Sequence, residues 1–315
     1  MKKIGFSLVL TLIALTVNAQ ESLTGYNFLR LPVSAHATAL GGDNVSLIDD
    51  DESLIFQNPA LLSSVSDRSV FLSYMRYMKG VNAGSAAFNR VLSDRAAWAV
   101  SGQYVHYGTM KRAGTDGIVT GEFTAKDIAL TGYFSYLLTD RLAGGIATKI
   151  ITSSLGEYRA LAVGVDLGLN YYVEEADFSA SLVARNLGGQ LKTFNEEHEK
   201  MPISVELGAT KRFRNTPFRL HAMLTDVTHW DYKFIYHVKV GIDALLTESI
   251  WIGAGYNFRQ GHEMEIVTGD SERSSHGAGL SVGAGINLER FKLNLAYGKY
   301  HVSSDALLLN AAFTL

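Results

Sequence analysis

Apolar and polar residues alternate along most of the chain after about residue 67. The pattern is clearest at 161–171, 203–212, 236–243, 280–289 and 307–315, where every second residue is apolar. Successive side chains of a β-strand point to opposite faces of a sheet, so each stretch predicts a strand with one apolar face. The other face is rich in Gly, Ser and Asn, which favours the crowded interior of a membrane barrel over the wet face of a soluble sandwich.

Short polar breaks separate these strands, and they recur about every 40 residues. They lie at 92–95, 138–141, 174–177, 214–217, 246–249 and 288–291, with longer polar segments at 108–125, 189–200 and 260–275. Short turns on one rim and longer loops on the other are typical of outer-membrane barrels. We therefore expect residues 67–315 to form an all-β fold, a transmembrane antiparallel β-barrel of about 14 strands.

The stretch 39–62 does not follow a strand pattern. It reads ALGGDNVSLIDDDESLIFQNPALL, with a glycine pair, an acidic run and Asn-Pro, all of which interrupt regular structure. Its apolar residues need a surface to bury against, because a segment this short cannot fold alone. We expect residues 20–66 to form a small N-terminal plug segment inside the barrel, with Asn58 and the acidic run bound to lumen residues such as Arg185 or Arg212. The predicted plug residues are Gly41, Gly42, Asp49, Asp50, Asp51, Asn58 and Pro59.

The first 19 residues predict export. Lys2 and Lys3 precede the apolar stretch 4–17, and small residues follow at Val17-Asn18-Ala19, which is the pattern of a secretory signal peptide. No later run of about 18 apolar residues is present, so we expect no membrane-spanning helix. Export and alternating strands together predict the outer membrane of a Gram-negative cell.

The amino-acid composition favours strands and argues against several functions. The chain has 30 Gly, 4 Pro, 15 Tyr and 15 Phe, which suits many strands joined by tight turns. A formal net charge of −3 argues against a nucleic-acid partner. The absence of Cys excludes disulfides, thiol catalysis and Cys-based metal sites.

The sequence offers no convincing motif for enzymatic chemistry. His-Glu-x-x-His and Ser-x-x-Lys do not occur, and the one Gly-x-Ser-x-Gly spacing, Gly279 to Gly283, lies inside the strand alternation and not at a strand-to-helix turn, so we expect no enzyme and no cofactor. The acidic run 49–52 lacks the spacing of a calcium loop, which favours a solvated turn over a metal site. We expect the glycines of 277–279 and 283–285 to relieve crowding inside the strand pattern. Inward-facing charges should pair with opposite charges across the lumen; they are Lys149, Asp166, Arg185, Glu206, Arg212, Arg219, Lys239 and Asp243.

The N-terminal stretch and the strands together resemble a known family. A Gly-Gly turn, an acidic run and Asn-Pro-Ala ahead of a barrel of about 14 strands are similar to the long-chain fatty-acid transporter (FadL-like) superfamily of outer-membrane proteins. Within it, the stretch 39–62 resembles the PorV/PorQ family of type IX secretion system proteins, and the compact barrel is closest to the PorQ branch.

The resemblance implies a function. It implies a non-enzymatic outer-membrane component that anchors a PorZ-like surface partner, with PorU and PorV in one attachment complex that links secreted cargo to anionic lipopolysaccharide. Outer-membrane lipids or lipopolysaccharide are further expected contacts. Two alternatives stay open: a FadL-like passive transporter of hydrophobic solutes and a PorV-like cargo-shuttle protein.

The longer segments are the expected docking surface. They mix charged with aromatic and aliphatic residues, which suits an interface of buried anchors inside a polar rim. The predicted partner-docking residues are Lys111, Arg112, Phe123, Phe194, Glu196, His262 and Met264.

Overall fold

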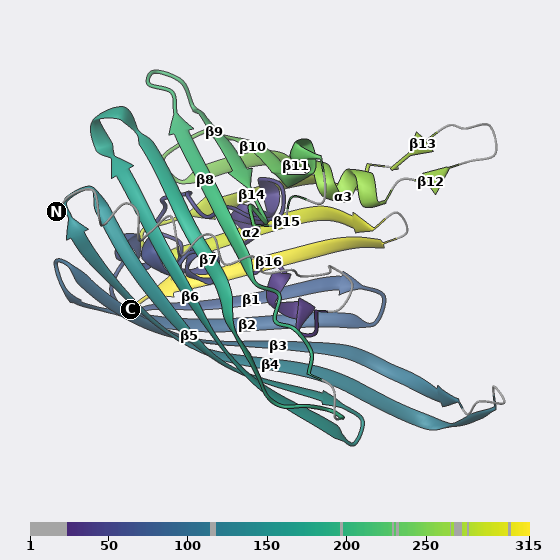
Figure 1. The fold of residues 1–315 in the computed structure, drawn as a ribbon. Helices are drawn as coiled ribbons and strands as arrows, with labels where there is room; N and C mark the ends of the chain where they lie inside the picture. Colours follow the sequence, from purple (N-terminus) through teal and green to yellow (C-terminus); the bar gives the residue numbers. More distant parts are fainter. Residues whose placement is uncertain are drawn as a thin grey trace.

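The described residues form a closed antiparallel barrel of fourteen strands (Figure 1). The computed structural model describes residues 24–113, 118–195, 198–228, 230, 233–264, 266–267, 273–275, 277–301 and 304–315. The predicted signal peptide lies outside these residues. The barrel strands are β1 (Ser69–Met78), β2 (Val81–Ser93), β3 (Ala96–Ala113), β4 (Val119–Thr139), β5 (Leu142–Leu155), β6 (Tyr158–Val173), β7 (Phe178–Lys192), β8 (Ser204–Arg212), β9 (Phe218–Leu224), β10 (Val238–Leu245), β11 (Ile250–Asn257), β14 (Leu280–Asn287), β15 (Phe291–His301) and β16 (Ser304–Thr314).

The first and last strands close the barrel. β1 pairs with β16 in an antiparallel register that runs from Ser69 opposite Thr314 to Arg76 opposite Leu307. Closure removes the free strand edges that lipid cannot hydrogen-bond. The predicted fold class, a closed antiparallel barrel of about 14 strands, is therefore confirmed.

The predicted alternation appears as two faces of the wall. Large apolar side chains that point outward are exposed along every long strand, as a lipid-facing surface requires; examples are Leu72, Val100, Leu130, Ile150, Leu167, Leu207, Ile242, Val282, Leu295 and Leu309. Among the described residues, no helix has the length and apolar character needed to cross a membrane.

The six predicted short turns all lie between strands, on the rim where β16 ends; we call it the short-turn rim. The opposite rim, the outer rim, differs from the prediction. The segment 108–125 is mainly strand, because β3 and β4 continue as a hairpin that projects past its neighbours (Figure 1). Polar side chains are compatible with a strand there, since a hairpin beyond the lipid needs no apolar face.

The other outer connections also carry structure of their own. The segment 189–200 begins within β7, and 260–275 contains the end of α3 (Phe258–Glu263) and a small hairpin of β12 (Ile266–Val267) and β13 (Arg273–Ser274). The connection between β9 and β10, with η6 (Phe234–His237), is long and escaped the sequence prediction.

Residues 24–66, which we call the N-terminal segment, contain four short helical elements. They are η2 (Asn27–Arg30), α2 (Ala35–Ala39), η3 (Glu52–Phe56) and η4 (Pro59–Ser64). Side-chain oxygens of Ser34, Asp51 and Asn58 cap the last three by accepting backbone N–H groups. Pro59 occupies the first position of η4, where its missing N–H costs nothing.

The N-terminal segment lies in the lumen (Figure 1). α2 packs on β11, β14, β15 and β16, η3 on β1 and β2, and η4 on β3 to β6. Side chains of the segment also reach β7 through Ser181, β8 through Thr210, β9 through Arg219 and β10 through Asp243. A segment that touches every strand of a closed barrel lies inside it.

Candidate functional site

The candidate site is the contact between the N-terminal segment and the inner wall, and one part of it is a glycine pair. Gly145 on β5 lies directly opposite Gly168 on β6. A Cβ on Gly145 would collide with the backbone of Pro59 and Ala60, and one on Gly168 would collide with the Asn58 side chain. We call this pair the first glycine window; it lets the Asn-Pro-Ala backbone approach the wall.

A second glycine pair faces the other end of the segment. Gly241 on β10 lies opposite Gly255 on β11, and a Cβ on either would collide with Leu40. We call this pair the second glycine window. Gly283 on β14 is crowded in the same way by Ala39, so the prediction that this glycine relieves crowding is confirmed.

The other glycines of the predicted crowded run behave differently. Gly277 and Gly279 precede β14 and have φ of 81° and 87°. They serve a turn ahead of the strand, so the expected position inside the strand is wrong. A Cβ on Gly279 would nevertheless collide with the Asn257 carbonyl, so this glycine does relieve crowding. Periodicity alone does not locate the start of a strand.

The glycines of the N-terminal segment itself turn the backbone. Gly41 and Gly42 have φ of 109° and 96°, a region that residues with a Cβ rarely adopt. The Gly41 N–H donates to Ser281 Oγ at 3.0 Å, and this hydroxyl donates to the Ala39 carbonyl at 3.1 Å. The turn is therefore fixed to β14.

Asn58 joins the segment to itself and to the wall. Its Nδ2 donates to the Val45 carbonyl at 2.9 Å and to Ser181 Oγ at 3.3 Å, while its Oδ1 accepts from Ala60 N at 2.9 Å. Asn58 is fully buried, so each of these bonds replaces a bond to water.

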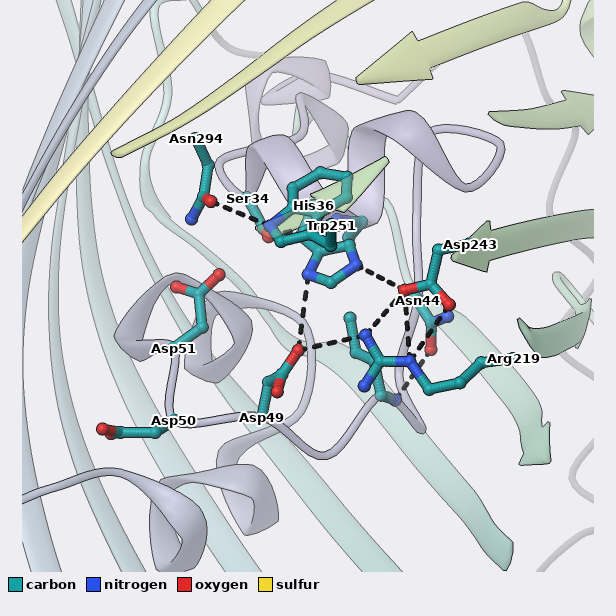
Figure 2. Close-up of polar contacts among 12 residues, drawn as sticks. Ser34, His36, Asn44, Asp49, Asp50, Asp51, Arg219, Asp243, Trp251 and Asn294 are labelled. Atoms are coloured by element: carbon teal, nitrogen blue, oxygen red, sulfur yellow. Dashed lines mark hydrogen bonds and ion pairs between the residues drawn. The ribbon is translucent and has the colours of Figure 1, made fainter. Parts of the chain in front are cut away.

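A buried charge network holds the segment next to the second glycine window (Figure 2). Asp243 on β10 accepts from Arg219 Nη2 at 2.6 Å and Nε at 3.0 Å, and from His36 Nε2 at 2.8 Å. Its side chain is 0% exposed. Asp49 of the N-terminal segment lies 3.3 Å from Arg219 Nη2, so the guanidinium joins the wall to the segment.

His221 on β9 is a further hydrogen-bond donor to Asp243, and its ring is neutral. Asn44 Oδ1 accepts from the N–H groups of Ser46 and Leu47, both at 2.9 Å, which assigns its amide nitrogen to the His221 side. That nitrogen lies 3.1 Å from His221 Nδ1, so Nδ1 must accept. The proton of His221 is then on Nε2, which donates to Asp243 Oδ1 at 3.2 Å.

The acidic run is divided among separate partners. Asp50 pairs with Lys292 Nζ at 2.5 Å and accepts from Ser66 N at 2.7 Å. Burial alone would raise the pKa of Asp50, but these partners outweigh burial and lower it. Asp49 binds Arg219, as described above. The expected partners Arg185 and Arg212 are therefore wrong for this run, because β9 and β15, not β7 and β8, lie beside it.

The end of the acidic run is buried. Burial raises the pKa of Asp51, although its carboxylate accepts hydrogen bonds from the N–H and hydroxyl of Ser53, which act in the opposite direction. Burial, with the neighbouring Asp51 charge, raises the pKa of Glu52 to about 8. Neither Glu52 carboxyl oxygen has a hydrogen-bond partner among the described residues. The sequence interpretation as a solvated turn is therefore wrong for these two residues, because η3 turns them inward.

The inward-facing charges of the wall pair as predicted. Lys149 Nζ lies 2.6 Å from Asp166, and Arg185 lies 3.5 Å from Glu206. Arg185 also lies 3.3 Å from Asp43 of the N-terminal segment. The exception is Arg212, which is exposed at the short-turn rim.

Two cavities larger than a single water lie beside the N-terminal segment, and a third of about 20 Å³ borders Leu29 and Phe56. One of about 420 Å³ reaches inward from the short-turn rim to Asp49 and Trp251, and its lining includes Arg212, Asp177 and Glu248. The other, about 160 Å³, is lined by charged residues that include Arg30, Asp43, Arg185, Asp226 and Arg259. Both linings are polar and of mixed charge.

The predicted docking residues are scattered over the outer rim. Lys111 and Arg112 are exposed on β3. Phe123 is on β4 and lies opposite Met110 of β3. Phe194 packs against the buried core that includes Tyr26 and Phe28, which removes it as a free anchor.

The remaining predicted docking residues lie near α3 or beyond the described chain. The His262 ring stacks on Tyr236 with centroids 4.2 Å apart, and Met264 ends α3. Glu196 lies outside the described residues. Sequence reasoning missed Trp230 and Phe234, which are 54% and 59% exposed and lie nearly parallel. The aromatic cluster at 230–237 was the signal that could have found them.

Comparison with known proteins gives a family and a fold. The family model "Type IX secretion system membrane protein PorP/SprF" matches residues 132–310. No curated protein sequence matches the chain.

Solved structures of similar shape are transport proteins of low sequence identity. The Pseudomonas putida toluene transporter TodX has 14% identity and a TM-score of 0.56, over 92% of this chain and 97% of that one. The CymD monoaromatic hydrocarbon channel has 13% identity and a TM-score of 0.58, over 90% and 97%. A Pseudomonas aeruginosa FadL homologue has 12% identity and a TM-score of 0.54, over 88% and 97%. These likenesses show that the barrel has the FadL-like fold.

Proposed function

The chain belongs to the type IX secretion system PorP/SprF family of membrane proteins, and we propose that it anchors a surface partner at the outer membrane. It is an outer-membrane component of that secretion system. The finer proposal is a PorQ-like role, in which a PorZ-like protein is held at the surface in a complex with PorU and PorV, and secreted cargo is joined to lipopolysaccharide.

The observation that carries the proposal is the occupied lumen. The N-terminal segment touches every strand, and the two larger cavities beside it are polar and charged. A carrier of hydrophobic solutes needs an apolar pocket with a few polar groups. The inner face of this barrel instead holds ion pairs such as Lys149–Asp166. This supports a barrel that acts through its rims.

The outer rim has the features that an interface needs. Barrels of this class carry short turns on the periplasmic side and longer connections on the outside, which places the β3–β4 hairpin at the cell surface. Exposed Trp230 and Phe234 supply aromatic anchors of the kind that dominate interface energetics. Lys111 and Arg112 supply separate charged contacts on the β3–β4 hairpin.

The proposal is tested by shortening and substitution on the outer rim. In one variant the β3–β4 hairpin is cut back to a tight turn after His106; in another, Trp230 and Phe234 are changed to Ala. Both should fold, because barrel pairing ends below these sites, and both should retain less surface partner in affinity purification from detergent-solubilised membranes. Arg290→Ala on the short-turn rim is the control and should retain it.

The same variants distinguish the alternatives. The shared fold with TodX and the FadL homologue motivates a passive transporter of hydrophobic solutes. If toluene uptake depends on this protein and partner retention is normal in both variants, the docking proposal fails and the transporter takes its place. If cargo proteins co-purify in place of a stable surface partner, a PorV-like shuttle is the better description.

A further inference from the structure

His36 is a buried histidine held between two carboxylates from different parts of the molecule. Its Nε2 lies 2.8 Å from Asp243 Oδ2 on β10, and its Nδ1 lies 3.5 Å from Asp49 Oδ2 of the N-terminal segment (Figure 2). Nδ1 has no hydrogen-bond partner among the described residues. The Nε2–H donates to Asp243, which leaves Nδ1 facing Asp49 as the place for a second proton.

The charges around His36 are unbalanced while its ring is neutral. Asp243 and Asp49 carry two negative charges and Arg219 carries one positive charge, whereas His221 is neutral because its Nδ1 accepts from Asn44. Asp51 also faces this group and is buried. A buried excess charge is costly, and a second proton on His36 removes it.

The ring contact of His36 also favours its charged form. The His36 and Trp251 rings stack with centroids 3.7 Å apart and planes 7° from parallel. A cation over an indole face is attracted by the ring quadrupole, more so when the pair is desolvated. The Trp251 face also fixes the imidazole plane, so that Nδ1 stays aimed at Asp49.

Protons have a route to this group. The cavity of about 420 Å³ that opens at the short-turn rim is lined by Asp49, Arg219 and Trp251. The Asp49 side chain is 27% exposed, whereas that of His36 is 1% exposed. Asp49 therefore borders both the cavity and the buried ring.

We propose that His36 is a proton-operated latch that binds the N-terminal segment to the barrel wall through Asp49. With two protons, His36 donates to Asp243 and to Asp49, and the segment is held. Loss of the Nδ1 proton leaves the Asp49 carboxylate with Arg219 alone, and the segment loosens next to the cavity. The latch therefore tightens where the ring holds its second proton and loosens as the pH rises and that proton is lost.

The latch is tested by thiol labelling, since the chain has no Cys. Ile48→Cys places one thiol beside Asp49 at the cavity wall, and Thr247→Cys places one on an exposed turn at the same rim. The ratio of the maleimide labelling rates at the two sites cancels the intrinsic pH dependence of thiol reactivity. Both cysteine variants also carry Glu52→Gln, because the raised pKa of Glu52, about 8, would otherwise add its own pH dependence to the labelling ratio.

The expected result is a labelling ratio that rises from pH 5 to pH 8, by at most about tenfold per pH unit, because the loss of one proton is coupled to loosening of the segment. His36→Gln keeps one donor for Asp243 but cannot gain a charge, and should give a ratio independent of pH. Asp49→Asn leaves the His36–Asp243 contact intact and should flatten the ratio as well. The double variant should then add nothing further.

Two results would overturn the latch. One is a ratio that does not change with pH while His36 is present. The other is a purely structural effect, in which His36→Gln and Asp49→Asn raise labelling by the same factor at pH 5 and pH 8. Because Asp49→Asn leaves the buried ring and its stacking in place, it remains informative even if His36→Gln does not fold.

Discussion

The two glycine windows hold the N-terminal segment with the same backbone geometry but with different chemistry. At the first window, Gly145 and Gly168 receive Asn58, Pro59 and Ala60, and the polar contacts there are neutral, such as the bond to Ser181. At the second window, Gly241 and Gly255 receive Leu40 beside the charged group of Asp243. The wall has no Cβ at either contact, so backbone shape alone does not distinguish them.

The two windows should therefore respond to different changes: the first to added side-chain volume, the second also to changes of charge. A neutral contact between backbone and glycine responds to volume and is insensitive to pH. A buried group of two carboxylates, a guanidinium and two imidazoles responds to the loss of any partner and to protonation. We therefore expect the two windows to tolerate added volume equally badly, and to differ when charge is changed.

The largest expected effect is at the charged window. Asp243→Ala leaves the Arg219 guanidinium and the His36 and His221 N–H groups without their shared acceptor. Removing one partner of a buried ion pair costs roughly 3–5 kcal/mol. The free energy of unfolding in detergent, from denaturant titration, measures this loss.

The matched control lies at the neutral window. Ser181→Ala removes one hydrogen bond from Asn58 and should cost about 1 kcal/mol. If Asp243→Ala costs no more than Ser181→Ala, the charged network does not hold the segment, and the contrast between the windows is wrong.

An intermediate effect is expected from added volume. Gly145→Val and Gly255→Val place side-chain atoms where the backbone of Ala60 and of Leu40 now lies. Overpacking of this kind costs typically 1–3 kcal/mol, so both variants should lower the melting temperature by similar amounts. Gly132→Val is the control, since its Cβ would meet Thr148 Oγ1 at an ordinary 3.7 Å. A large loss at one window with no loss at the other would show that the windows are not equivalent in fit.

A pH dependence of stability is expected from Glu52. Burial raises its folded pKa to about 8 from its ordinary value of 4.5, so the folded barrel favours the neutral acid. This contribution is fully present below the unfolded pKa and is lost as the pH rises through the folded pKa, between about pH 4.5 and 8. Melting temperatures of Glu52→Gln should decline less over this range than those of the parent.

A control for Glu52 is Glu248→Gln on an exposed turn, which should leave the pH profile of the parent unchanged. An unaltered profile in Glu52→Gln would mean that the buried carboxyl does not contribute.

Much of the barrel was determined by the sequence alone. Alternation along stretches such as 161–171 predicts strands, and the six polar breaks fall at the six short turns, because lipid outside and a crowded lumen inside impose a strict period of two. The glycine pair at Gly41 and Gly42 likewise follows from local backbone geometry. These features depend on near neighbours in the chain.

The tertiary structure decided the partners. Asp49 binds Arg219, Asp50 binds Lys292 and His36 binds Asp243, pairs that join residues 170 to 242 positions apart. The polar alternation marks Arg185, Arg212 and Arg219 equally as inward-facing. Which of them meets the acidic run depends on how the segment threads the closed lumen, and threading is set by where the two glycine windows admit its backbone. Periodicity carries no such information, because it reports the face of a side chain and not the distance across the barrel.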